Sequence, residues 1–90
     1  MSDGNTTWQK ELTAALAENN ETWADVESHT LEPDQLTRSF YAGYGGSEGD
    51  PFTLWTKAYV YFPIVYDGAE WVGCAPRNPN GVPTPHQGGQ

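Results

Sequence analysis

The sequence contains only one cysteine, Cys74, in 90 residues, so an internal disulfide is impossible. A chain without disulfides suits a reducing compartment, and we expect a cytoplasmic protein. The sequence also lacks any apolar run near the ~18 residues of a membrane span, and its first residues do not resemble a signal peptide. These absences argue against a secreted or membrane-inserted protein.

Basic residues are scarce as well: four Lys and Arg stand against twelve Asp and Glu, and the net charge is −8. Residues 1–50 carry all of this excess, whereas residues 51–90 contain two acids and two bases. Direct binding to DNA, RNA or an anionic membrane would set phosphates against uncompensated carboxylates. The charge favours a basic partner protein, or it forms a solvated face that keeps a small protein soluble.

Patterns that support catalysis or metal binding are missing. His29, His86 and Cys74 are isolated in the sequence, without the close ligand pairs of zinc sites. The acids between Asp25 and Asp34 do not match a calcium loop. No nucleophile stands near a base, and Cys74 in a strand-like run is typical of a small buried hydrophobe. We therefore expect no catalytic residues, no metal and no cofactor, and a protein that is not an enzyme.

The glycine-rich stretch 43–51 resembles a phosphate-binding loop only superficially. A Walker loop needs Gly-Lys-Ser/Thr, and the first lysine after the glycines is Lys57. The dinucleotide pattern needs a sixth-position glycine, where this chain has Glu48. We interpret the stretch as a connector between two parts of one domain.

Aromatic residues are abundant, at 13% of the chain against an apolar share of 37%. Seven rings exceed what a few short elements can easily hide: Tyr41, Tyr44, Trp55, Tyr59, Tyr61, Tyr66 and Trp71. Exposed Tyr and Trp side chains carry much of the energy of protein interfaces. The rings therefore indicate either an aromatic core or a recognition surface.

The first half of the chain has helical signals. Thr6 and Gln9 match a capping box, and an apolar stripe with helical spacing follows it. Asn19 and Asn20 then favour a helix end. The stripe consists of Trp8, Leu12, Ala15 and Leu16.

Residues 22–31 are compatible with a short helix or an edge strand, and we favour a helix that begins at Thr22. The next helix is better marked, with Pro33 at its first position. Leu36 and Phe40, four residues apart, are expected to point inward, and Gly43 is expected to end the helix.

From residue 52 onward the pattern becomes that of β-structure. Asp67-Gly68 favours a two-residue hairpin turn, which places Ile64 opposite Trp71. Pro63 indicates a local edge or bulge, and residues 52–56 predict a third strand. Both hairpin faces are largely apolar, so the second is either buried or exposed to a partner. We expect the core face to consist of Val60, Phe62, Ile64, Trp71 and Ala75.

The predicted fold class is α+β: two or three N-terminal helices packed on a small antiparallel sheet of about three strands, followed by an irregular Pro/Gly-rich tail. A chain of this length predicts a single domain, 1–90. Its parts are an acidic helical part (6–42), the connector (43–51), a β part (52–75) and the tail (76–90).

These features favour a small, acidic, non-catalytic inhibitor or adaptor that binds a basic or nucleic-acid-binding protein. A sharper form of the hypothesis is a DNA mimic that blocks the partner's nucleic-acid-binding surface, as phage anti-CRISPR or anti-restriction proteins do; it rests on analogy. Alternatives are a self-associating structural or assembly protein and, with less support, a small-molecule-binding domain or enzyme. The residues expected at the partner surface are Glu18, Glu21, Asp25, Glu27, Glu32, Asp34, Tyr44, Glu48, Asp50 and Trp55.

Overall fold

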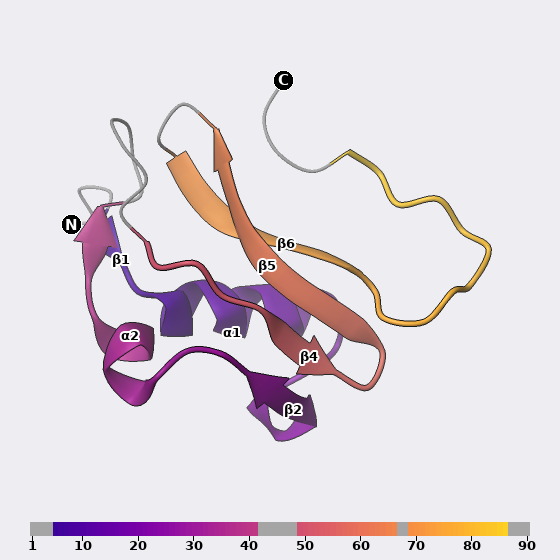
Figure 1. Cartoon of the computed structure of the whole chain (residues 1–90), viewed down its shortest axis with the longest axis horizontal. Coiled ribbons are helices and arrows are strands. Elements are labelled where there is room, and N and C mark those ends of the chain that lie inside the picture. The colour runs from indigo at the N-terminus through magenta and orange to yellow at the C-terminus, as the bar shows by residue number, and fades with distance from the viewer. Residues whose placement is uncertain (1–4, 42–48, 67–68, 87–90) are drawn as a thin grey trace.

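The computed structural model describes residues 5–41, 49–66 and 69–86. Figure 1 shows the arrangement of the elements along the chain. In order they are β1 (Asn5–Thr6), α1 (Trp8–Glu18), the 3-10 turn η1 (Trp23–Asp25), β2 (Val26–His29), α2 (Pro33–Thr37), β3 (Phe40–Tyr41), β4 (Leu54–Thr56), β5 (Tyr59–Tyr66) and β6 (Ala69–Pro76).

The strands form one antiparallel four-stranded sheet in the order β2-β4-β5-β6, and β1 pairs separately with β3. The α+β class and the packing of a helix on an antiparallel sheet are confirmed. The expected number of helices is not matched, because within residues 5–41, 49–66 and 69–86 only α1 has several turns, with 11 residues. α2 has five residues, and η1 is a 3-10 turn. The main sheet gains its fourth strand from residues 26–29, for which we favoured a helix.

α1 begins one residue later than its capping box predicts. Thr7 is the N-cap, and its hydroxyl accepts a hydrogen bond from the Lys10 N–H at 3.1 Å. Thr6 belongs to β1 instead and donates its hydroxyl to the Glu11 carboxylate at 2.7 Å. Two consecutive threonines offer the same cap chemistry. The pairing of Thr6 with Phe40 in β1 and β3 selects between them.

Residues 22–31 contain both of the structures considered for them. Thr22 caps η1, and the Asp25 carboxylate accepts a hydrogen bond from the Thr22 N–H at 2.8 Å. The chain then enters β2, which pairs with β4 through a register shift between Val26 and Ser28. The cap at Thr22 thus begins a single 3-10 turn, which an edge strand follows directly.

The second helical segment begins as predicted and ends early. Pro33 occupies the first turn of α2, but the helix ends at Thr37, and Phe40 is a buried residue of β3. Leu36 packs against the core as expected. The predicted stop at Gly43 lies outside the described residues.

The hairpin register is confirmed along its whole length. Ile64 lies opposite Trp71, and Phe62 lies opposite Gly73. β4 pairs with β5 only at Val60 and Tyr61, so Pro63 lies where β5 has no partner in that direction among the described residues. A residue without an N–H donor is tolerated at such a local edge.

The expected core face of the hairpin is wrong, because the core lies on the opposite face of the sheet. Tyr61 is completely buried, and Val72 and Cys74 pack against the same core. We call this side, which α1 covers, the inner face. Leu12 and Leu16 of α1 are completely buried against it. Both faces of the hairpin are apolar, so alternation alone does not identify the inner one.

Residues 77–86 contain no helix or strand and are exposed. Arg77 anchors the start of this tail: its N–H donates to the Ala58 carbonyl at 2.9 Å. Further on, Gly81 has a φ of 76°, and the Val82 N–H donates to Asn80 Oδ1 at 2.9 Å. The left-handed backbone at Gly81 lets the chain turn there without the strain that a Cβ would cause. The tail is irregular in this range, as predicted.

Replacing Leu12 with Ala should lower the free energy of unfolding by about 2–5 kcal/mol, because it leaves a cavity between α1 and the inner face. Val82→Ala, at a side chain that is 66% exposed, is the matched control and should change it by less than about 0.5 kcal/mol. Urea denaturation followed by circular dichroism measures both values. Equal effects of the two substitutions would contradict the proposed core.

Candidate functional site

The side of the main sheet opposite α1 carries a continuous set of apolar side chains. Trp55, Val60 and Ala75 are cross-strand neighbours on β4, β5 and β6. Ile64 and Trp71 form another cross-strand pair on the same side. We call this surface the outer face. Its members are Trp55, Val60, Phe62, Ile64, Trp71 and Ala75.

Gly73 lies in the middle of the outer face and is covered by its neighbours. A Cβ at Gly73 would lie 2.8 Å from Ile64 Cδ1 and 3.0 Å from Phe62 Cε1. These distances are shorter than ordinary carbon contacts. The absence of a side chain at Gly73 therefore leaves the space above β6 to Ile64 and Phe62.

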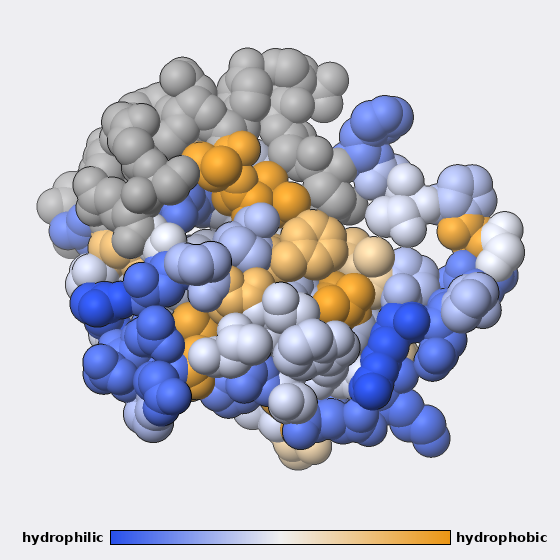
Figure 2. Space-filling model, viewed as in Figure 1, coloured by the Kyte–Doolittle hydropathy of each residue, from blue (hydrophilic) through white to orange (hydrophobic). Residues whose placement is uncertain are grey.

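No described helix or strand covers the outer face. All six of its side chains are only half-buried, and none belongs to the hydrophobic core or to the residues packed against it. Figure 1 shows α1 behind the sheet, with β5 and β6 toward the viewer. In the same view, Figure 2 shows apolar residues at the centre and hydrophilic residues at the left and right margins. Such a contiguous apolar patch is typical of an interaction surface.

The aromatic residues that the sequence analysis singles out lie on both faces of the sheet. Tyr61 is buried and Tyr59 packs against the core, both on the inner face. Trp55 and Trp71 belong to the outer face. Tyr44 and the side chains of Tyr41 and Tyr66 lie outside the described part. Only Trp55 was among the predicted contact residues of the outer face, because Trp71 was assigned to the core.

Several predicted acidic contact residues have contacts within the chain. Glu27 Oε1 accepts a hydrogen bond from Arg77 Nη1 at 2.5 Å, in an exposed ion pair. Asp50 pairs with Arg38, and its carbonyl accepts from Trp8 Nε1 at 3.0 Å. These carboxylates contribute to local structure as well as to the surface charge.

Asp25 and Glu32 have structural positions at the starts of η1 and α2. Asp25 closes the η1 capping box with Thr22. Glu32 is the N-cap residue of α2, and its N–H donates to Gln35 Oε1 at 2.7 Å. Charge reversal at either position would therefore alter the local fold together with the surface charge.

Among the predicted acidic contacts that the structure describes, Glu18 and Asp34 are the two without such contacts. Both are exposed: Glu18 is the last residue of α1, and Asp34 lies in the first turn of α2. Glu48 lies outside the described residues. The six acids between residues 18 and 34 are thus spread over α1, η1, β2 and α2 and the segments between them. Their role at a partner surface remains a prediction.

Glu21 is part of a polar cluster between the end of α1 and the inner face. The buried Tyr61 hydroxyl donates to Glu21 Oε1 at 2.6 Å. Asn19 Nδ2 donates to the Tyr61 hydroxyl at 3.0 Å and lies 3.4 Å from Cys74 Sγ. Burial of the phenol, and then its hydrogen bond to the Glu21 carboxylate, raise the pKa of Tyr61 far above its ordinary value. The cluster therefore holds the neutral phenol of Tyr61 against the end of α1.

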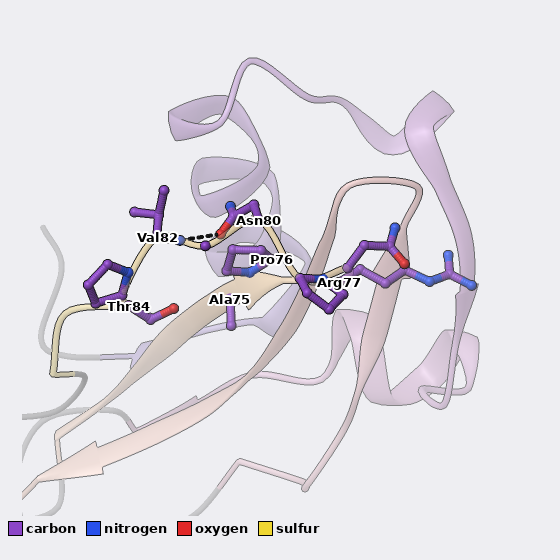
Figure 3. Close-up of a pocket in the computed structure, with 10 residues that line it drawn as sticks. Ala75, Pro76, Arg77, Asn80, Val82 and Thr84 are labelled. Atoms are coloured by element: carbon purple, nitrogen blue, oxygen red, sulfur yellow. Dashed lines mark hydrogen bonds between the residues drawn. The ribbon is translucent and has the colours of Figure 1, made fainter.

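Figure 3 shows the concavity that the tail makes beside the end of β6. It has a volume of about 580 Å³ and is lined by residues 75–84. Arg77 extends away from Val82 and Thr84, and its guanidinium is held by Glu27 and by the Thr56 carbonyl, the latter at 2.9 Å. A ligand site usually has several polar groups that converge on an apolar cavity. The concavity has no such arrangement among its lining residues.

A second cavity, of about 240 Å³, lies beside the described end of the connector. Gly49, Pro51 and Pro63 line it together with Glu70, whose carboxylate accepts the Gly49 N–H at 3.1 and 3.2 Å. The less-supported alternative of a small-molecule-binding domain or enzyme requires a pocket near residues 43–50, of which 43–48 lie outside the described part. Neither cavity gathers a nucleophile, a base and an oxyanion donor among its lining residues.

The described ranges contain no group of three or more His, Cys, Asp or Glu side chains that could hold a metal ion. In the same ranges, none of the helices has the length and apolarity needed to cross a membrane. No protein-family model, curated protein or solved structure matches this chain significantly. The functional argument therefore rests on the residues and geometry described above.

We expect the free energy of unfolding to decline as the pH rises above about 10, because the unfolded Tyr61 phenol then ionises while the folded one resists ionisation. This contribution is fully present below that pH. Urea titrations from pH 7 to pH 11 would measure the decline.

Tyr61→Phe should reduce this alkaline decline and cost about 1–3 kcal/mol at pH 7, because Asn19 and Glu21 lose their partner. Tyr59→Phe is the matched control and should retain the decline of the wild type. Parallel pH dependence in the wild type and Tyr61→Phe would contradict the role of the buried phenol.

Proposed function

We propose that this protein is a small, non-catalytic adaptor or inhibitor that binds a basic partner protein in the cytoplasm, with the outer face as its contact surface. The observation that carries the proposal is the set of six apolar side chains on the outer face that no described element covers. Trp55, Phe62 and Trp71 belong to this set.

Aromatic residues at such a surface are well suited to binding proteins. Trp and Phe remove a large apolar area from water, and their side chains have few rotatable bonds to order. Interface hot spots are enriched in Trp and cluster near the centre of a contact. Trp55 and Trp71 lie on different strands of the outer face, with Val60, Phe62 and Ile64 on the strand between them. The outer face thus has the composition of an interface centre.

The charge of the chain supports a basic partner. The net charge is −8, whereas the outer face itself contains no charged side chain. Long-range attraction by the acidic residues would increase the rate of encounter with a basic surface, and apolar contact at the outer face would then keep the complex together. Affinity is expected to depend mainly on the outer face, and the association rate on the acids.

Affinity capture with a tagged chain, in a lysate of the organism that encodes it, tests the proposal when variants are compared in parallel. Trp71→Ala should abolish capture of a protein that the wild type retains, because it removes a large ring from the outer face. Val82→Ala changes an exposed tail residue and should leave capture unchanged. Mass spectrometry identifies the retained protein, and titration with the purified protein gives the Kd of each variant.

The folded state of Trp71→Ala is checked by circular dichroism and thermal unfolding. A second outer-face variant, Trp55→Ala, tests the same surface from β4. Full retention of the partner by both folded variants would rule out the outer face as the contact surface.

The spread of exposed acidic residues favours a second candidate, in which they imitate nucleic-acid phosphates and block a basic surface of the partner. Glu18 and Asp34 are the appropriate positions for a test, because neither side chain has a hydrogen bond or ion pair within the described part of the chain. Reversal at Glu27 or Glu32 would also disturb the Arg77 ion pair or the start of α2.

The double variant Glu18→Lys/Asp34→Lys should weaken partner binding about tenfold or more in low salt if these carboxylates replace phosphates. It should have a smaller effect in 0.5 M NaCl, where exposed charges are screened within about 4–5 Å. Surface plasmon resonance against the captured partner measures both rates. A loss of association rate alone, with an unchanged dissociation rate, would favour electrostatic steering over mimicry.

A further inference from the structure

We propose that the outer face binds one amphipathic α-helix of its partner, with an apolar stripe against the sheet and Lys or Arg residues along its sides. This inference rests on the proposed function and specifies the form of the partner. It is argued from the dimensions of the outer face, from the layer that the face lacks, and from the charge of the chain.

The dimensions of the outer face match one helix. The outer-face side chains run from Val60 to Ile64 on β5 and from Trp71 to Ala75 on β6, which corresponds to a strip about 17 Å long at a rise of 3.4 Å per residue. Two strands about 5 Å apart, with side chains leaning outward, make a strip about 10 Å wide, which is the diameter of an α-helix. About 11 helical residues, or three turns, span the same length. β4 widens the strip only at Trp55, since its pairing with β5 covers two residues.

The inner face shows how this sheet is covered by a helix. α1 closes the inner face with three buried side chains at helical spacing, Trp8, Leu12 and Leu16. The outer face has a comparable set of apolar side chains and no helix of the described chain over it. An apolar face of a sheet is buried where another layer of secondary structure packs on it. A helix from the partner would supply the missing layer.

The side positions of such a helix should be basic. The chain has an excess of eight negative charges, and Arg38 and Arg77 are already paired with Asp50 and Glu27. A helix with apolar residues at i, i+3, i+4 and i+7 places its remaining side chains toward solvent and toward the margins of the sheet. Lys and Arg in these positions also extend their apolar stems over the rims of Trp55 and Trp71.

A second copy of this chain fits the outer face less well. Two copies each carry a charge of −8, so their approach is opposed by electrostatic repulsion. Charge therefore favours a basic helix over self-association.

Three synthetic 18-residue peptides test the inference directly. The first has Leu at i, i+3, i+4 and i+7 spacing and Lys elsewhere. The second keeps the Leu positions and has Glu in place of Lys, and the third has the composition of the first with its Leu periodicity scrambled. Binding to the purified full chain is followed by tryptophan fluorescence, since Trp55 and Trp71 become buried, and the Kd is measured by calorimetry at 0.15 M NaCl.

We expect the Leu/Lys peptide to bind and the other two to bind at least about tenfold more weakly. Ile64→Lys, at the centre of the outer face, should weaken binding of the Leu/Lys peptide about tenfold or more. Val82→Lys introduces the same charge on the exposed tail and should leave the Kd within about twofold. Trp55→Ala provides a second outer-face variant if Ile64→Lys unfolds.

Equal weakening by Ile64→Lys and Val82→Lys would overturn the inference, since binding would then follow net charge alone. Tight binding of the scrambled peptide would overturn it too. A dimer of the wild type in light scattering, converted to a monomer by Ile64→Lys, would assign the outer face to a second copy. Failure of the peptide, with partner capture still dependent on Trp71, would refute the helical form and leave the proposed function in place. If the peptide does not bind and partner capture is also independent of Trp71, both the inference and the proposed function are refuted.

Discussion

The placement of Tyr61 on the inner face is the constraint on which the rest of the structure depends. Its buried hydroxyl is shared between Glu21 and Asn19, at the point where α1 ends. A phenol is stable in the interior only where its O–H has a partner, so these contacts determine which side of the sheet α1 covers. Because strand residues alternate, the same choice places Trp55, Ile64 and Trp71 on the other side.

The outer face and the acidic surface thus arise from different parts of the chain. The outer face is built from residues 55–75, in the half with no net charge, and the negative charge belongs to residues 1–50. Several acids combine surface charge with local structure, as Asp25 does in the cap of η1. In the proposed complex, attraction at a distance and apolar contact at close range would therefore come from separate elements.

The sequence predicted the hairpin register because local chemistry determines it. The Asp67-Gly68 pattern favours a two-residue turn, which predicts the observed pairing of Ile64 with Trp71. It did not predict the inner face, because both sides of the hairpin are apolar and the choice depends on Tyr61 meeting residues forty positions away. The candidate site was predicted in part: Trp55 was included, whereas Trp71 was assigned to the core. The sequence signal for the outer face is the apolar character of both sides of one hairpin. The predicted register also places Gly73 opposite Phe62, which is consistent with the close packing around Gly73.

Arg77, just after β6, contacts two other strands and one turn at the same end of the sheet. Its backbone reaches the turn between β4 and β5 at Ala58, and its guanidinium reaches Thr56 on β4 and Glu27 on β2. Because Arg77 directly follows β6, this one residue connects the last strand of the sheet with its first, across the two strands between them. The start of the tail is therefore linked to the edge strand β2 through one side chain. A pull on the C-terminal segment would load this contact with β2 as well as the ladder between β5 and β6.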